Sequence, residues 1–382
     1  MKLSDKINMR KKCSILIIGA GPAGASLAWY LACQGIDAIL IDRKKAAGSP
    51  VRCAEYVPSV ISRLYDIPIA GVDLITSSMS TFIDYREEKT TRAPGFMLDR
   101  KRFSSWLIES FQEKGGKYIN QAKAVSFNEE KGHISTTVIS KGSQIHISSR
   151  FVAGADGPDS VVGKYISSIN EGFVLGLNEN IPVEARDKER TMVFFSPEIP
   201  GGYGWLFPRG KSINLGIGCE APYDRVTGSL DLKAIYREFK NKIFSMDFIK
   251  AGNIRDSVPQ GKITAGLIPS SGMVENPARG RFILAGDAAG LSNPITGAGI
   301  YNAVLSADII SRIILEAPGE DDPGIANKIK EEYDSTFGIS LSRASARRNI
   351  LLSKWPESIR DGQDFSTLIK DTWVAFTSYW KK

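Results

Sequence analysis

The sequence of 382 residues is poor in the side chains that most often carry catalysis without a cofactor. It has two histidines, His133 and His146, within a polar alternating stretch that predicts exposed positions on strands. Histidine-based triads, Cys–His pairs and histidine metal sites are therefore nearly excluded. We infer that the chemistry comes from a bound cofactor.

Cysteine is equally scarce. The four cysteines, Cys13, Cys33, Cys53 and Cys219, are scattered along the chain, and none belongs to a C-x-x-C pair. Zinc centres and iron–sulfur clusters are usually built from closely spaced ligands, so we expect no metal site. The same scatter gives no sign of a disulfide framework.

Long apolar runs are missing as well. No stretch of about 18 apolar residues is present, so we expect no membrane-spanning segment. The N-terminal segment is basic, but the apolar run behind it is too short for a secretion signal. We therefore expect a cytoplasmic protein.

The formal net charge is +7. Nucleic-acid binding favours basic clusters interleaved with aromatic residues along one module, and the sequence has none, so no nucleic-acid partner is expected. Much of the excess lies near the N-terminus, at Arg343, Arg347 and Arg348, and at Lys381 and Lys382. A basic face near an anionic lipid surface or a phosphorylated substrate fits this distribution better.

What the sequence does contain is a complete nucleotide-binding unit near its start. An apolar strand over residues 15–18 leads into the turn Gly-Ala-Gly-Pro-Ala-Gly, and a helix follows over 25–33. A second strand over 38–41 ends on Asp42. This order predicts a βαβ unit for an adenine dinucleotide.

Each glycine of the turn has a mechanical reason. Gly19 permits the tight turn, Gly21 lets the backbone approach a pyrophosphate, and Gly24 lets the helix pack close to the strand. The start of the helix offers free N–H groups to the phosphates. Asp42, 18 residues after Gly24, can accept hydrogen bonds from ribose hydroxyls.

The remaining pattern favours an α/β fold with two interleaved domains and a helical C-terminal region. We expect a discontinuous Rossmann-type domain over 1–70, 97–170 and 270–320, a cap or substrate domain of antiparallel β-sheet over 71–96 and 171–269, and a helical region over 321–382. Trp355, Trp373 and Trp380 of this last region are expected to pack between helices, with a lipid-facing cluster as the alternative.

Three later motifs complete a known series. Asp99-Arg100, GADGPDSVVG at 154–163 and GDAAGLSNPITGAGI at 286–300 follow the first turn in this order. The series resembles that of flavoprotein hydroxylases of the glutathione-reductase-like FAD superfamily, with their p-hydroxybenzoate hydroxylase-like fold. The resemblance implies bound FAD, and no second G-x-G-x-x-G turn is present for a separate nicotinamide domain.

Two further segments resemble the geranylgeranyl reductase family. They are GSPVRCAEYV at 48–57 and YGWLFPR at 203–209, the latter closing on Leu215-Gly216. Arg209 and Leu215 stand where the family has Lys and Val. Tyr56 replaces a glycine, and this bulky side chain would reshape the pocket over the flavin.

The resemblance implies reduction of isolated double bonds in geranylgeranyl chains, and it assigns site residues. FAD contacts are expected from Gly19, Gly21, Ala23, Gly24, Asp42, Cys53, Ala54, Arg100, Ala124, Asp156, Gly286, Asp287, Gly297, Gly299 and Ile300. Cys53 is expected to position FAD or to assist proton delivery, and Glu55 is expected to donate or relay a proton. An apolar substrate pocket is expected from Tyr56, Tyr203, Trp205 and Phe207.

Several alternatives stay open. The electron donor is NAD(P)H or a ferredoxin-like carrier, and contact with a membrane periphery is a further expectation. An FAD monooxygenase acting on an aromatic or peptidyl substrate would use the same scaffold. A prenyl-binding escort of the related GDI fold is the non-enzyme alternative, although the intact GADG and GDAAG motifs argue against it.

Overall fold

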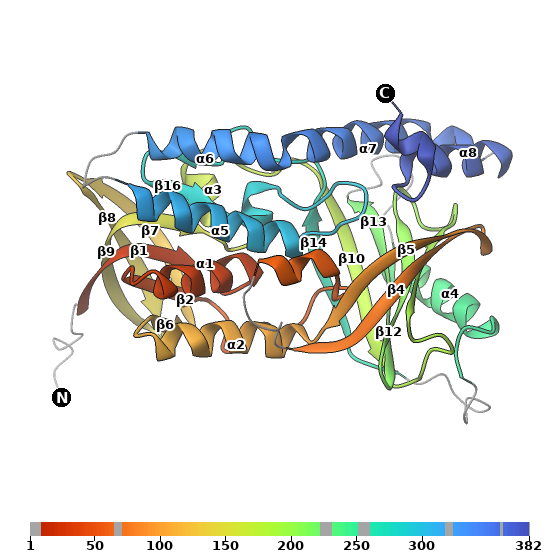
Figure 1. The fold of residues 1–382 in the computed structure, drawn as a ribbon, viewed down its shortest axis with the longest axis horizontal. Coiled ribbons are helices and arrows are strands. Elements are labelled where there is room, and N and C mark those ends of the chain that lie inside the picture. Colours follow the sequence, from red (N-terminus) through yellow and green to blue (C-terminus); the bar gives the residue numbers. More distant parts are fainter. Residues whose placement is uncertain are drawn as a thin grey trace.

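The computed structural model describes residues 9–64, 71–221, 231–250, 260–317, 324–359 and 362–381. The expected domain boundaries near residues 70 and 320 lie outside these ranges, as do Lys382 and the basic residues before residue 9. These residues form two β-sheets side by side, with the C-terminal helices along one long edge of the molecule (Figure 1).

The first sheet holds the nucleotide-binding unit. Its central strand pairs in parallel with the strands that flank it, in the order β15-β16-β9-β1-β2-β6, while β7 and β8 extend it by antiparallel pairing. The strands are β1 (Met9–Ile18), β2 (Ala38–Asp42), β6 (Lys117–Asn120), β7 (Ala122–Glu130), β8 (His133–Ser140), β9 (Ser143–Gly154), β15 (Ala278–Arg279) and β16 (Phe282–Leu284).

The first strand is longer than its apolar run predicts. It begins at Met9 because its polar first half continues to pair with β9, from Met9 opposite Ile145 to Ile18 opposite Gly154. Two expectations also need correction here. The first helix begins at Pro22 rather than at residue 25, and both histidines are half-buried rather than exposed.

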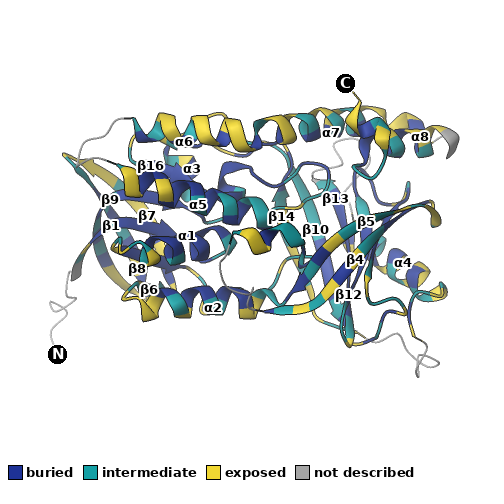
Figure 2. Cartoon of the chain, viewed as in Figure 1, coloured by how far each residue is buried: buried dark blue, intermediate teal, exposed yellow. Residues whose placement is uncertain are grey.

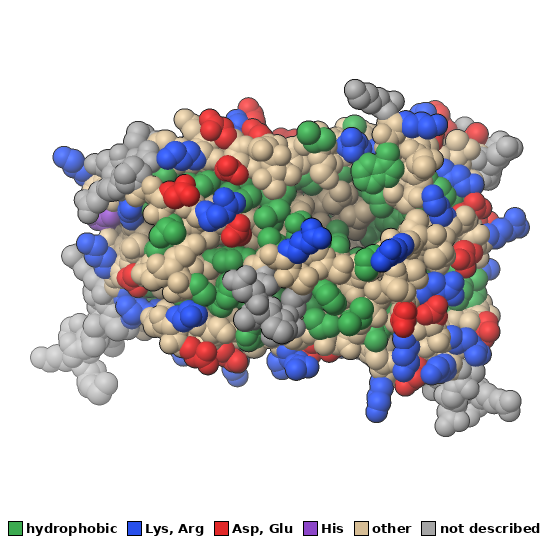
Figure 3. Space-filling view, in the orientation of Figure 1, with side chains coloured by type: hydrophobic (Ala, Val, Ile, Leu, Met, Phe, Trp, Pro, Cys, Tyr) green, Lys and Arg blue, Asp and Glu red, His purple; other side chains and the backbone are tan. Residues whose placement is uncertain are grey.

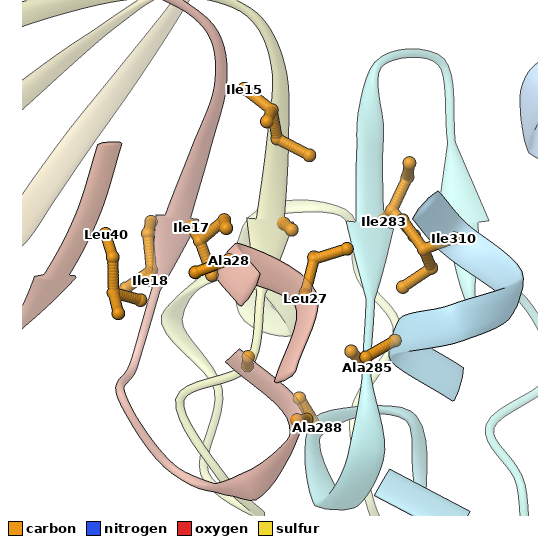
Figure 4. Packing of buried hydrophobic residues seen from close by; sticks show 14 of the residues in the cluster. Ile15, Ile17, Ile18, Leu27, Ala28, Leu40, Ile283, Ala285, Ala288 and Ile310 are labelled. Carbon is orange, nitrogen blue, oxygen red and sulfur yellow. The ribbon is translucent and has the colours of Figure 1, made fainter. Parts of the chain in front are cut away.

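Helices cover this sheet and give it a continuous core. Helix α1 (Pro22–Cys33) packs between α2 (Arg100–Glu113) and α5 (Ile300–Glu316). Aliphatic side chains fill the space between strands and helices, as Figure 4 shows for Ile17, Leu27, Leu40 and Ile310. The buried faces of α1 and α5 are visible in Figure 2.

The second sheet has the order β14-β10-β13-β12-β11-β4-β5-β3. Its strands are β3 (Tyr56–Pro58), β4 (Val72–Ile83), β5 (Arg86–Leu98), β10 (Phe173–Ile181), β11 (Arg190–Phe195), β12 (Tyr203–Arg209), β13 (Ser212–Ala221) and β14 (Ile263–Pro269). Helix α4 (Leu232–Ser245) packs on β13. The sheet is not purely antiparallel as expected, because β11 pairs in parallel with β4.

The C-terminal helices run from the first sheet to the second. Helix α6 (Ile325–Tyr333) packs on α5, and α7 (Ile339–Ser358) and α8 (Gly362–Thr372) lie over the second sheet (Figure 1). A short helix, α3 (Val161–Tyr165), follows β9, and the single turns are η1 (Ser59–Arg63), η2 (Gly286–Ala289), η3 (Asp334–Gly338) and η4 (Thr377–Trp380). Trp355 and Trp373 are buried, whereas Trp380 is exposed.

Candidate active site

A cavity of about 940 Å³ runs from the first turn of the nucleotide-binding unit to the C-terminal segment. All of the predicted site residues line it except Gly24 and Gly286. Those two glycines lie behind the wall. A Cβ on Gly24 would come within 1.8 Å of the Gly19 carbonyl oxygen, and one on Gly286 within 2.9 Å of the Ala23 Cβ.

The end of the cavity at the first turn is formed largely by backbone. Gly19 has φ +103°, which glycine adopts without strain, and its N–H donates to the Ile41 carbonyl at 2.8 Å. A Cβ on Gly21 would meet no atom within 4 Å, so backbone here is open to a ligand. Helix α1 starts immediately afterwards, and no side chain of the described residues caps its N-terminus. Uncapped N–H groups at a helix start fit a pyrophosphate.

Asp42 lies at the end of β2 and lines the same part of the cavity. Its two carboxylate oxygens accept one backbone N–H each, from Ala20 at 2.8 Å and from Lys44 at 2.7 Å. A carboxylate oxygen can accept more than one hydrogen bond, so the group keeps capacity for ribose hydroxyls. Ala124, on β7, lines the cavity as well.

A second helix also begins at the cavity. Helix α5 follows Gly299 without a side-chain cap from the described residues. Asp287 accepts a hydrogen bond from the Ser292 hydroxyl at 2.7 Å, and burial raises the pKa of this carboxyl group. A Cβ on Gly299 would come within 2.2 Å of the Ser292 Oγ. The glycine therefore lets the helix start close to Asp287.

Asp156 has a structural task that the sequence did not suggest. Its carboxylate accepts from the Ser160 hydroxyl at 2.6 Å and from the Val161 N–H at 2.8 Å, which fixes the start of α3. Burial raises its pKa, and the hydrogen bond from Ser160 opposes that shift. Asp156 still lines the cavity beside the nucleotide-binding turn.

The loop that carries Cys53 is held by the second sheet. The Cys53 carbonyl accepts from the side-chain amides of Asn214 at 3.1 Å and Asn178 at 3.4 Å. Its sulfur accepts from the Glu55 N–H at 3.3 Å. Burial raises the pKa of the Cys53 thiol above its usual range. The thiol therefore stays protonated at neutral pH and can hold a proton at the cavity wall.

Glu55 is almost fully buried, at 1% exposure, and has φ +69°. Its carboxylate pairs with Arg209 at 2.8 Å and accepts from the Arg100 N–H at 3.3 Å. Burial raises the pKa of Glu55, while the Arg209 guanidinium lowers it. The Glu55 carboxylate is thus held by partners on several elements. It fixes the position of its loop and also lines the cavity.

Aromatic side chains form the opposite part of the wall. Tyr203 and Trp205 lie with their ring centroids 6.1 Å apart, and Trp205 and Phe207 with theirs 6.4 Å apart. The Tyr203 hydroxyl donates to the Thr296 carbonyl at 2.6 Å, so its polar end is satisfied. Tyr56 packs against Phe207 at 6.0 Å and donates from its hydroxyl to the Ala93 carbonyl. The predicted pocket residues are thus brought together on one apolar wall.

Three cavity or network residues were missed by sequence reasoning. Trp373 packs against Tyr203 with ring centroids 5.3 Å apart and lines the cavity from the end of α8. Arg348, on α7, is buried, lines the cavity and pairs with Glu220. Asn214 joins Trp205 to the Cys53 loop. No motif marks these positions, because each acts through partners distant in sequence.

Two further observations concern metal sites and membrane-spanning helices. Among the described residues, no group of three or more His, Cys, Asp or Glu side chains is placed to hold a metal ion. Within the same ranges, no helix combines the length and the apolar character that a membrane span needs.

Comparison with protein families matches residues 12–57 and 65–317 to the FAD binding domain family. The digeranylgeranylglycerophospholipid reductase 2 of Methanosphaera stadtmanae is 30% identical over 375 residues, which cover 90% of this chain and 89% of that protein. The digeranylgeranylglycerophospholipid reductase of Methanocella arvoryzae is 29% identical over 359 residues, covering 88% and 85%.

Solved structures share the fold. A geranylgeranyl bacteriochlorophyll reductase-like protein from Thermoplasma acidophilum superimposes with a TM-score of 0.79 at 21% identity, over 95% of this chain and 97% of that one. The p-nitrophenol 4-monooxygenase of Pseudomonas putida gives 0.68 at 14% identity, over 95% and 98%. The predicted α/β fold with a Rossmann-type FAD-binding domain is confirmed.

Proposed function

Since the chain belongs to the geranylgeranyl reductase family of FAD-binding oxidoreductases, we propose that it reduces isolated double bonds in a geranylgeranyl or other polyprenyl chain carried by a lipid. The observation that carries the proposal is one continuous cavity, which joins the backbone at the first turn to the aromatic side chains of β12. A cavity with polar groups at one end and apolar rings at the other suits a cofactor and an apolar substrate together.

The residues present fit FAD at the polar end. The open backbone at Gly21 and the uncapped starts of α1 and α5 suit a pyrophosphate and a ring that gains negative charge. Asp42 and Asp287 offer carboxylates to ribose and ribityl hydroxyls. Bound FAD would, in its reduced form, supply a hydride to one alkene carbon.

The residues of the other end would orient the alkene and control protons. Tyr203, Trp205 and Phe207 offer apolar faces against which a prenyl chain can lie flat, and they exclude water from the reacting carbons. The Cys53 thiol, which lines the cavity and is kept protonated by burial, would give a proton to the second carbon. Glu55, in its ion pair with Arg209, holds that loop in place.

Two finer points belong to the same proposal. The donor of electrons is a transiently bound NAD(P)H or a ferredoxin-like carrier. The substrate resides in a lipid bilayer, so the protein works in contact with a membrane surface.

The test is anaerobic. Purified protein should carry FAD, and its chemically reduced form should be reoxidised by a geranylgeranyl lipid in the absence of oxygen. Saturated phytanyl lipid is the matched control and should leave the reduced form unchanged. Protein that takes up no FAD, or that reacts with neither lipid, would contradict the proposal.

A further inference from the structure

The last turn of the chain forms a surface beside the cavity wall. Trp373, Val374 and Ala375 line the cavity. The exposed Trp380 donates from its indole Nε1 to the Val374 carbonyl at 3.0 Å. The exposed indole ring is thus hydrogen-bonded directly to a backbone segment that lines the substrate end of the cavity.

Other apolar groups are exposed on neighbouring elements. Ile339, at the start of α7, is 77% exposed, and Trp380 is 56% exposed. Ile339 precedes Arg343 by four residues, so both lie on one face of α7. The Arg343 guanidinium lies over the Trp380 ring, 5.3 Å from its centroid, and joins the helix face to the last turn.

Basic groups accompany these side chains. Arg347 donates to the carbonyls of Tyr379 and Ser378 at 3.1 and 3.3 Å, which fixes the last turn against α7. The Lys89 ammonium lies 5.5 Å from the centroid of the half-buried Phe376 ring. Lys381 is exposed at the end of the described chain.

The acidic side chains nearby compensate only part of this charge. Glu88 is adjacent to Lys89 but forms an ion pair with Lys370 at 2.7 Å. Asp371 is exposed two residues before Trp373. The balance around Trp380 is therefore basic.

We call the set of Ile339, Arg343, Phe376, Trp380, Lys381 and Lys89 the terminal surface. We propose that the terminal surface docks on an anionic lipid bilayer and brings the substrate end of the cavity to the membrane. Indole rings favour the interface between headgroups and acyl chains, and each nearby basic side chain adds attraction to anionic lipid. The inference rests on the proposed function for its lipid substrate, but membrane binding is tested separately from reduction.

The displayed face of the molecule is hollowed. Figure 3 shows a hollow on the displayed face, bordered by hydrophobic side chains and by Lys and Arg side chains. An exposed apolar ring among basic groups suits a bilayer better than a purely acidic protein face, which would offer Trp380 and Ile339 no apolar surface to pack against. The charge and the apolar groups thus agree on one partner.

The test uses the full chain loaded with FAD and two kinds of vesicle, phosphatidylcholine alone and phosphatidylcholine containing phosphatidylglycerol. Flotation should recover wild-type protein with the anionic vesicles far more than with the neutral ones, and salt should reduce the recovery. Arg343→Glu should weaken binding about tenfold or more, and Trp380→Ala several-fold.

Matched controls are available on the other sheet. Leu315→Ser removes an exposed apolar side chain at the far end of α5, and Lys141→Glu reverses a charge in the turn between β8 and β9. Both should bind anionic vesicles as the wild type does. Equal binding by Arg343→Glu and wild type, or equal losses in the controls, would overturn the proposal.

Reduction is measured in parallel on substrate dispersed in detergent. There, Arg343→Glu and Trp380→Ala should match the wild type, whereas on vesicle-borne substrate they should be slower. If the two variants keep vesicle binding but lose reduction by an acidic redox protein, the surface serves a protein partner and the proposal is wrong. If wild type binds vesicles but reduces no prenyl lipid in detergent, the proposed function fails while the membrane surface stands.

Discussion

The indole Nε1 of Trp205 donates to the side-chain oxygen of Asn214 at 2.9 Å, and both residues are buried. This bond orients the amide of Asn214, whose nitrogen then donates to the Cys53 carbonyl at 3.1 Å and approaches the Glu55 carboxylate at 3.4 Å. One buried amide therefore connects the aromatic wall to the loop that carries the thiol.

Replacing that amide should loosen the loop. Asn214→Leu should lower the free energy of unfolding by about 1–3 kcal/mol, because it leaves buried donors and acceptors without partners. Urea unfolding measures the loss. The control Asn128→Ala, on an exposed part of β7, should change stability little. Equal stability of Asn214→Leu and wild type would show that these hydrogen bonds add nothing.

The Cys53 thiol should react slowly with alkylating agents. Burial raises its pKa above the ordinary value of 9.0. A raised pKa means that the reactive thiolate is scarce at neutral pH and accumulates only in more alkaline solution. Labelling with iodoacetamide in a Cys33→Ser background, followed by peptide mapping, should therefore show a Cys53 rate that is low at neutral pH and still increases with pH where the rate of an ordinary thiol has levelled off. Rapid labelling at pH 7 would contradict the assignment of a protonated thiol.

Asp42 should determine affinity at the adenosine end. Asp42→Asn should raise the dissociation constant of FAD about 10- to 100-fold, since a hydrogen bond to a charged group contributes about 1.5–3 kcal/mol. The absorbance spectrum of the flavin that remains bound should be unchanged. Asp37→Asn, an exposed position before β2, is the matched control and should bind as wild type. Unchanged affinity in Asp42→Asn would remove this residue from the site.

Tyr56 should control the width of the substrate end. Its ring lies over Gly95, where a Cβ would come within 2.3 Å of the ring. Tyr56→Gly should therefore widen the pocket, keep alkene reduction and accept bulkier prenyl chains. Product analysis on prenyl lipids of different length measures this. If the same variant instead consumes oxygen without reducing alkenes, the pocket serves a hydroxylation reaction.

Trp373 should matter for stability far more than Trp380. Trp373 is buried, and its indole donates to the Thr81 hydroxyl at 3.0 Å. Trp373→Ala should cost about 3–5 kcal/mol in unfolding free energy through the cavity that it leaves. Trp380→Ala, at an exposed position, should cost little, and denaturant unfolding of both variants makes the comparison. Comparable losses would contradict the burial described for the two rings.

Much of the first sheet could be predicted from sequence because its signals are local. The motifs mark places where an apolar strand or helix meets a position that needs a particular residue. These places are the turn from Gly19 to Gly24, the end of β2 at Asp42 and the start of α5 near Gly299. Such requirements are met by residues close together in the chain, so they leave a readable motif.

The second sheet was harder to predict because its contacts are distant. The β4–β5 hairpin has one exposed polar face, and its pairing register shifts at several points. Apolar residues therefore do not recur at every second position, which is the usual sign of a strand. The parallel pairing of β4 with β11 places Ser78 opposite Arg190. No local sequence pattern predicts a pairing between strands so far apart in the chain. Trp373 reaches Thr81 across 292 residues, and only the folded chain brings it to the cavity.

The most direct test of the account is the mass of the product. FAD-loaded protein, an electron donor and a geranylgeranyl phospholipid are incubated with and without oxygen, and the lipid is analysed by mass spectrometry. The account predicts the gain of two hydrogen atoms for each double bond, in both atmospheres and with FAD required. A product that gains an oxygen atom, only when oxygen is present, would contradict the reductase and assign the site to a monooxygenase.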